Sequence, residues 1–161
     1  MKPTLLAVCL AAVAIVQPSA VWADSTVKVE LWDKGAAAEM ATDLGYAKPL
    51  VNNANASMGV KLSVDSVPAG VVTFEVANAS KDTVHELLVM PLDDAGALMP
   101  YLANDSKIDE TKAGSKGEVS ELAFGKTGAV TLTLTPGKYL LVCNIANHYM
   151  AGMWTAFTVT K

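Results

Sequence analysis

Short stretches of alternating apolar and polar residues are the strongest constraint on how this chain can fold. Residues 71–78 read Val-Val-Thr-Phe-Glu-Val-Ala-Asn, and residues 129–135 alternate in the same way. A period of two places the apolar side chains on one face of a strand, whereas an amphipathic helix needs a period of 3.6. Six further strands are expected, at 26–31, 60–67, 86–90, 118–123, 139–144 and 155–160.

Turn-forming residues separate these stretches, at Pro68-Ala69-Gly70, residues 78–82 and Pro136-Gly137. Gly, Pro, Asn and Asp favour the backbone angles of tight turns. The pattern therefore predicts an all-β sandwich or barrel. Helix is expected to be the minority: a short one at 36–44, within an irregular stretch that reaches Met58. Residues 91–116 are expected to form surface loops with room for a helical turn.

The first 23 residues have the layout of a secretory signal peptide. Lys2 precedes an apolar run from Leu5 to Val16, and Val21-Trp22-Ala23 ends in a small residue at the expected cleavage point. The apolar run is shorter than the ~18 to 20 residues that span a bilayer. We expect a periplasmic or otherwise exported protein without a membrane anchor, with one domain at residues 24–161.

The charge balance argues against nucleic acid as a partner. The chain has 12 Lys plus Arg against 16 Asp plus Glu, a formal net charge of −4, and none of its basic residues is arginine. Proteins that bind nucleic acid need a basic surface to neutralise phosphates. No nucleic acid is therefore expected among the partners, and an anionic membrane surface is equally unfavourable.

The residues that carry chemistry gather in the segment CNIANHYMAGM, from Cys143 to Met153. Signal cleavage would remove Cys9, so Cys143 would have no disulfide partner within the mature chain. His148 lies five residues after Cys143 and five before Met153, and the other histidine, His85, lies 58 residues before Cys143. One thiolate, two imidazoles and one thioether are the ligands of a trigonal copper site with a long axial methionine bond.

Each of these residues alone has a simpler interpretation. Cys143 could be a small buried hydrophobe, His148 a loop residue and Met153 core filler. Taken together with His85, their order and spacing favour a metal site, because a strand, a loop and a second strand would bring three ligands together. Soft sulfur with neutral imidazoles favours copper over calcium or magnesium. For Met150 two interpretations stay open: packing in the core, or a role as a ligand or an exposed hydrophobic contact.

These motifs resemble the cupredoxins, the small blue copper proteins. The match rests on C-x4-H-x4-M, on TPGKYLLVC before it and GMWTAFTVT after it, and on VHELLV, which holds the first histidine. The spacing is most similar to the rusticyanin and sulfocyanin type, and the likeness covers residues 60–161. It implies an eight-stranded Greek-key sandwich and one-electron transfer. It also implies one type 1 copper, held by His85, Cys143, His148 and Met153.

The chain departs from the cupredoxin pattern at Glu86. Many cupredoxins have asparagine directly after the first histidine, whereas this chain has Glu86 there and Asn144 after the cysteine. Groups next to the ligands tune a metal site, so Glu86 bears on the potential and colour of this one. We expect Glu86 to be a neighbour of the site or a solvated carboxylate, not a ligand.

Two alternatives to an electron carrier stay open. A copper-tolerance protein that sequesters or handles copper would use the same ligands, and the extra methionines and Glu86 lean toward it. A metal-free β-sandwich interaction domain would share the fold alone. An enzyme is not expected, because a second copper centre would need further histidines. We expect a monomer with a redox partner docking near His148, inside an apolar patch of Tyr149, Met150 and Ala151.

Overall fold

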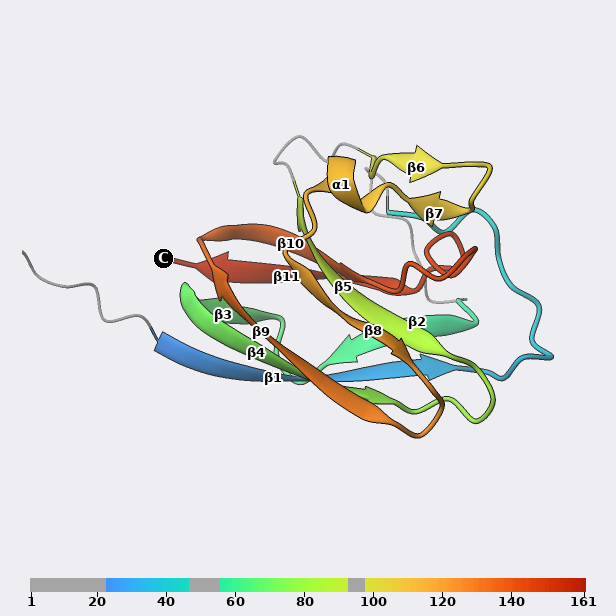
Figure 1. Cartoon of the computed structure of the whole chain (residues 1–161), viewed down its shortest axis with the longest axis horizontal. Helices are drawn as coiled ribbons and strands as arrows, with labels where there is room; N and C mark the ends of the chain where they lie inside the picture. The colour runs from blue at the N-terminus through green and yellow to red at the C-terminus, as the bar shows by residue number, and fades with distance from the viewer. Residues whose placement is uncertain (1–22, 47–55, 93–97) are drawn as a thin grey trace, which may run out of the picture.

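The computed structural model describes residues 23–46, 56–92 and 98–161 (Figure 1). The signal peptide expected at 1–23 falls outside these ranges except for residue 23, and it stays a prediction. Within the described ranges, no helix has the length and the apolar character that crossing a membrane requires.

Two packed sheets, one small hairpin and one short helix make up the described part of the chain. The first sheet has the order β2-β1-β4-β9, formed by Met58–Leu62, Ala23–Asp33, Gly70–Asn78 and Thr127–Leu134. The second has the order β3-β11-β10-β5-β8, formed by Ser66–Pro68, Trp154–Thr160, Gly137–Val142, His85–Leu92 and Gly117–Leu122. The hairpin pairs β6 with β7, and the short helix α1 follows, with bounds Tyr101–Leu102, Lys107–Ile108 and Glu110–Ala113. The predicted all-β sandwich is confirmed.

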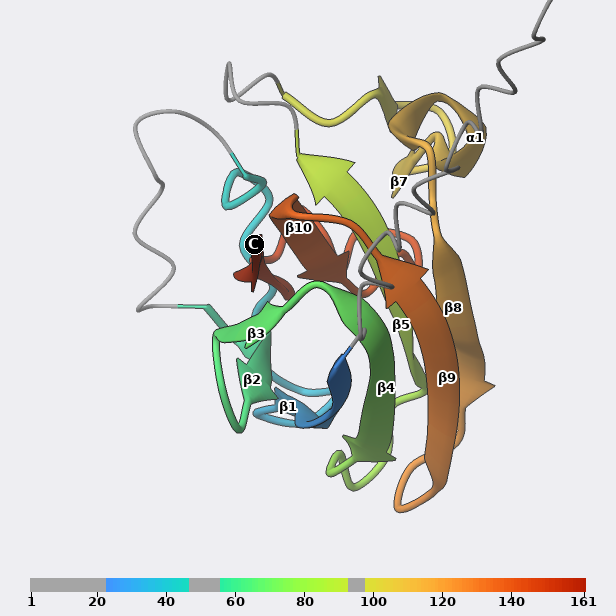
Figure 2. The ribbon, with the colours of Figure 1, turned by 90° about the vertical axis from the view of Figure 1, so that its left-hand side faces the viewer.

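The alternation in the sequence becomes the two faces of each strand. In β4, Val72, Phe74 and Val76 are buried while Glu75 is exposed to solvent, because successive side chains point to opposite faces of a strand. Phe74 meets Phe157 of the other sheet with ring centroids 5.4 Å apart in an edge-on arrangement. This contact belongs to the main core, which lies between the two sheets; Figure 2 labels the strands of both sheets.

Strands β1 and β4 run parallel, which brings the end of β1 to the same end of the sandwich as the start of β5. Their register pairs Ala23 with Gly70 and Leu31 with Asn78. Asp33 therefore lies just beyond the last pair, close to the turn that leads from β4 to His85. The loop between β10 and β11 lies at this same end (Figure 1).

The expected strand at 60–67 is divided into β2 and β3. Ser63 N–H donates to the carbonyl of Lys28 in the first sheet at 2.9 Å, whereas the carbonyl of Asp65 accepts from Thr158 N–H in the second at 2.9 Å. The chain changes sheets between these two residues, so one alternating stretch serves both layers.

The helix predicted at 36–44 is wrong, because this segment forms turns and bends. Ala38 N–H donates to the carbonyl of Gly35 at 2.9 Å, and Leu44 N–H donates to the carbonyl of Met150 at 2.8 Å. The segment lies against the β10–β11 loop, and these contacts outweigh the helix propensity of its alanines.

The helical turn allowed within 91–116 is present as α1. The carboxylate of Asp109 caps its start by accepting from Lys112 N–H, and Gly114 ends it in a left-handed conformation with φ 68°. Together with the β6–β7 hairpin, α1 covers the outer face of the second sheet (Figure 1). A second core forms there, of Tyr46, Leu88, Met90, Leu92, Met99, Ile108, Ala113, Leu140, Val142, Tyr149 and Trp154.

Candidate metal centre

The four residues predicted as copper ligands come from three places at one end of the sandwich. His85 is the first residue of β5, and Cys143 follows the last residue of β10. His148 lies in the β10–β11 loop, and Met153 immediately precedes β11. Because β10 pairs with both β5 and β11, the sheet places the ends of these strands side by side.

Backbone hydrogen bonds close the β10–β11 loop around the site. Cys143 N–H donates to the carbonyl of Met153 at 3.0 Å, and Met153 N–H donates to the carbonyl of His148 at 3.0 Å. Asn147 turns the chain with φ 72°, a left-handed conformation that asparagine tolerates better than most residues. The loop therefore fixes three of the four residues relative to one another.

Three potential ligand atoms face one another at short range. The Nδ1 atoms of His85 and His148 are 3.3 Å apart, and Cys143 Sγ lies 3.3 Å from His148 Nδ1 and 3.9 Å from His85 Nδ1. A point equidistant from these three atoms lies about 2.0 Å from each of them. This distance is close to the roughly 2.0–2.3 Å of metal–nitrogen and metal–sulfur bonds. All three residues are buried, and they form the one group of its kind that the described residues contain. The donor set therefore fits a metal ion.

Met153 and Met150 have different surroundings. Met153 is fully buried and belongs to the main core together with Cys143. Met150 packs against the second core, and a Cβ added to Gly45 would lie 2.8 Å from its Sδ. The thioether of Met150 is thus in contact with the segment that includes Gly45, which favours packing for Met150 over a role at the metal.

Burial keeps the metal-free residues of the site uncharged. It raises the pKa of Cys143 to about 12, while the backbone N–H of Glu86, 3.4 Å from Sγ, opposes this shift. Burial, together with the neighbouring His85, lowers the pKa of His148 to about 4. Neutral imidazole is the form that binds a metal, and a coordinated thiol loses its proton.

Sequence reasoning missed Asp33. Its Oδ2 lies 2.8 Å from Nε2 of His85, and the two residues are 52 positions apart in the chain. Burial opposes the negative charge of this carboxylate, but hydrogen bonds from Ser80, Thr83, Gly35 and His85 together lower the pKa of Asp33. The expected strand ended at residue 31 and no motif marks residue 33, so the sequence held no signal for this contact.

Glu86 is a buried neighbour of the site. Its side chain lies in the interior, and its Oε1 has no hydrogen-bond partner among the described residues. Burial raises the pKa of Glu86 to about 7; Lys107 opposes the shift, and Glu110, Glu118 and Glu121 add to it. The expectation of a solvated carboxylate is wrong, whereas a position beside the ligands agrees with its backbone contact to Cys143.

The prediction of an exposed apolar patch around His148 is also wrong. Tyr149 and Ala151 are 3% and 0% exposed, and the hydroxyl of Tyr149 donates to the carbonyl of Tyr46 at 3.3 Å. The tyrosine ring therefore points into the second core. The exposed residues of this loop are Ala146 and Asn147.

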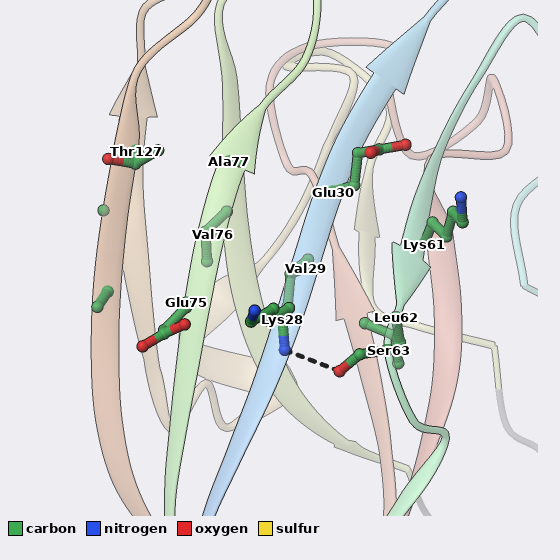
Figure 3. Close-up of a pocket in the computed structure, with 12 residues that line it drawn as sticks. Lys28, Val29, Glu30, Lys61, Leu62, Ser63, Glu75, Val76, Ala77 and Thr127 are labelled. Carbon is green, nitrogen blue, oxygen red and sulfur yellow. Dashed lines mark hydrogen bonds between the residues drawn. The ribbon is translucent and has the colours of Figure 1, made fainter.

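A hollow of about 650 Å³ on the outer face of the first sheet shares no residue with the metal centre (Figure 3). Strands β1, β2, β4 and β9 line it, with charged residues such as Lys28, Lys61 and Glu75. One hydrogen bond joins Lys28 N–H to Ser63 Oγ at 2.9 Å. None of its lining residues is histidine or cysteine, so the metal chemistry belongs to the other site.

Comparisons with known proteins bear on the family and the fold. The sulfocyanin (SoxE) domain model matches residues 45–161. Rusticyanin from Thiobacillus ferrooxidans is similar in structure, with 19% identity, 83% of this chain and 75% of that chain covered, and a TM-score of 0.52. Auracyanin A, a "blue" copper protein from Chloroflexus aurantiacus, is similar at 19% identity, with 85% and 99% covered and a TM-score of 0.50. At such identities these two structures support the fold alone. No curated protein sequence matches the chain.

Proposed function

We propose that this chain, which belongs to the sulfocyanin (SoxE) domain family, carries single electrons between redox partners outside the cytoplasm. The family match confirms the resemblance to cupredoxins of the rusticyanin and sulfocyanin type. The cofactor is accordingly one type 1 copper. Cupredoxins of this family are electron carriers and not generally enzymes, and we propose no catalysis.

In this proposal His85 and His148 would bind the metal through Nδ1, Cys143 would bind through Sγ, and Met153 would bind through its thioether sulfur. Copper supplies the one-electron chemistry by changing between Cu(II) and Cu(I). The observation that carries the proposal is the buried triangle of Nδ1, Nδ1 and Sγ atoms, with edges of 3.3 to 3.9 Å.

The protein's part is to hold these ligands in one arrangement for both oxidation states. The hydrogen bonds between Cys143, His148 and Met153 brace the loop. Strand β5 and the last four residues of β10, which precede Cys143, are buried on both faces. Burial also excludes water from the ligand atoms. A fixed, dry site needs little rearrangement when an electron arrives or leaves, and fast exchange requires this.

Metal binding and colour test the proposal. The purified protein should bind one copper, and Cu(II) should give an intense visible band from thiolate-to-copper charge transfer. Cys143→Ser should remove this band, whereas Met150→Leu should retain it, because Met150 packs against Gly45. A band that survives Cys143→Ser, or a wild-type protein that binds only tetrahedral zinc, would contradict the assignment.

A copper-tolerance protein is the alternative that shares this site. Met90 and Met99 are buried in the second core and Met150 packs against it, which supports packing for these methionines over a solvent-facing copper store. Gene deletion separates the two functions, because loss of a carrier should cause a respiratory defect and loss of a tolerance protein should cause copper sensitivity.

Export, a monomeric state and a docking site near His148 complete the proposal. Cleavage after residue 23 would deliver the domain to the periplasm, and amino-terminal sequencing of the mature protein tests this. A redox partner would approach His148 over Ala146 and Asn147, the exposed residues of the loop. Sedimentation of the purified protein tests the monomeric state.

A further inference from the structure

The two ring nitrogens of His85 face different groups. Nδ1 points to the other potential ligands, at 3.3 Å from His148 Nδ1 and 3.9 Å from Cys143 Sγ. Nε2 lies 2.8 Å from Oδ2 of Asp33. A neutral imidazole carries one N–H, and a carboxylate accepts hydrogen bonds but donates none. The proton of neutral His85 therefore belongs on Nε2, which leaves a lone pair on Nδ1.

The carboxylate of Asp33 is itself held in place. Its Oδ1 accepts from Gly35 N–H at 2.9 Å, in a turn that Gly35 makes with φ 96°. Strand pairing joins Asp33 to Met58, and Lys34 N–H donates to the carbonyl of Ser57 at 2.8 Å. The carboxylate thus has a fixed position behind His85 and little freedom to rotate away.

Both members of this pair are removed from solvent. The side chain of His85 is 0% exposed and that of Asp33 is 4% exposed. Charges interact more strongly in such surroundings than in water. A metal ion would bind on the far side of the imidazole. The negative charge of Asp33 would stabilise a doubly charged ion there more than a singly charged one.

We propose that Asp33 is a positioning residue for the copper site, which holds His85 in the Nε2–H tautomer and places a buried negative charge behind this ligand. The proposal rests on the copper-carrier function proposed above and adds a residue outside the family match, which begins at residue 45. Partners of this kind orient metal-ligating histidines and raise their basicity. Asp33 should therefore favour Cu(II) over Cu(I) and lower the reduction potential.

Two substitutions separate the two roles of Asp33. Asp33→Asn keeps an oxygen that can accept from Nε2–H but removes the charge, whereas Asp33→Ala removes both. Asp82→Asn is the matched control, because Asp82 is an exposed carboxylate in the adjoining turn that binds Ala36 N–H and the Thr83 hydroxyl.

The first measurement is the reduction potential of the copper-loaded proteins. Asp33→Asn should weaken the preference for Cu(II) about tenfold, which for one electron is a rise of about 59 mV. Asp82→Asn should stay near the wild-type potential. Asp33→Ala should in addition weaken Cu(II) binding by about 10- to 100-fold.

The second measurement uses the metal-free protein. Nitrogen chemical shifts of His85 should show one tautomer in the wild type and in Asp33→Asn, and a mixture in Asp33→Ala. Equal potentials for Asp33→Asn and Asp82→Asn would overturn the proposal, as would a wild-type tautomer in Asp33→Ala. A wild-type protein without the blue band would instead overturn the proposed function, and the tautomer would still decide the positioning role.

Discussion

The side chain of Asn144 binds both backbone polar groups of Ile108. It accepts from Ile108 N–H at 2.7 Å and donates to the Ile108 carbonyl at 3.0 Å, and it also donates to Oε1 of Glu110 at 2.8 Å. Asn144 is 1% exposed and directly follows Cys143. Asn144, the residue after Cys143, thus connects β7 and α1 to the metal centre. These hydrogen bonds hold the β6–β7 hairpin and α1 against the second sheet.

Asn144→Ala should destabilise the protein by about 2 to 3 kcal/mol, because it leaves buried groups of Ile108 without partners. Asn144→Asp should be at least as harmful, since a carboxylate would face the Ile108 carbonyl and the Glu110 carboxylate. Asn104→Ala, at an exposed turn position, is the control and should change stability by less than about 0.5 kcal/mol. Urea unfolding of the metal-free proteins measures all three; equal stability for Asn144→Ala and Asn104→Ala would contradict the role of the side chain.

Gly59 is a position where the structure leaves no room for a side chain. A Cβ there would lie 2.8 Å from Cζ2 and 2.9 Å from Nε1 of Trp32, the residue with which Gly59 pairs. Gly59→Ala should push the ring off the strand and cost about 1 to 3 kcal/mol.

Gly137→Ala provides the comparison for Gly59→Ala, because its added Cβ would meet nothing closer than 3.9 Å. Its unfolding temperature should stay close to that of the wild type. An unchanged unfolding temperature for Gly59→Ala would mean that Trp32 moves aside at no cost.

The sequence was sufficient for the parts of the site that depend on local spacing. Cys143, His148 and Met153 occupy one loop between two strands, so their order in the chain already limits how far apart they can lie. His85 could be added because the chain has only two histidines. The alternation of β4 likewise predicted its buried face, since period two is a local property.

Features that depend on distant contacts could not be predicted in this way. Asp33 reaches His85 only because β1 and β4 pair in parallel. The helix expected at 36–44 is replaced by a segment bound to Met150 and Trp154, whose Nε1 donates to the Leu44 carbonyl at 2.6 Å. Tyr149 turns inward for the same reason, because its hydroxyl finds the carbonyl of Tyr46.

Met153 should tune the copper without being needed to load it, because a long thioether bond contributes less than the three equatorial ligands. Met153→Leu should keep one copper and raise the reduction potential, with little effect on folding since the side-chain volumes are similar. Met150→Leu should leave the potential unchanged. If Met150→Leu shifted the potential and Met153→Leu did not, the axial ligand would be Met150.

The last prediction concerns docking at the β10–β11 loop. Ala146 is exposed and lies two residues before His148, so a partner that exchanges electrons through this histidine should contact it. The acidic balance of the chain suggests a basic partner surface. Ala146→Lys should therefore slow electron exchange through repulsion while the visible spectrum stays the same, and added salt should reduce the difference by screening.

Thr133→Lys is the matched control for Ala146→Lys, because it adds the same charge at an exposed position of β9. Thr133 pairs with Val71, near the end of the sandwich away from the metal loop (Figure 1). Stopped-flow mixing with a basic redox protein at low salt compares the two. Transient redox interfaces are small, below about 1,200 Å² in total, so one added charge inside the interface should dominate the rate. Equal slowing by both substitutions would assign the effect to net charge and would remove the β10–β11 loop from the docking surface.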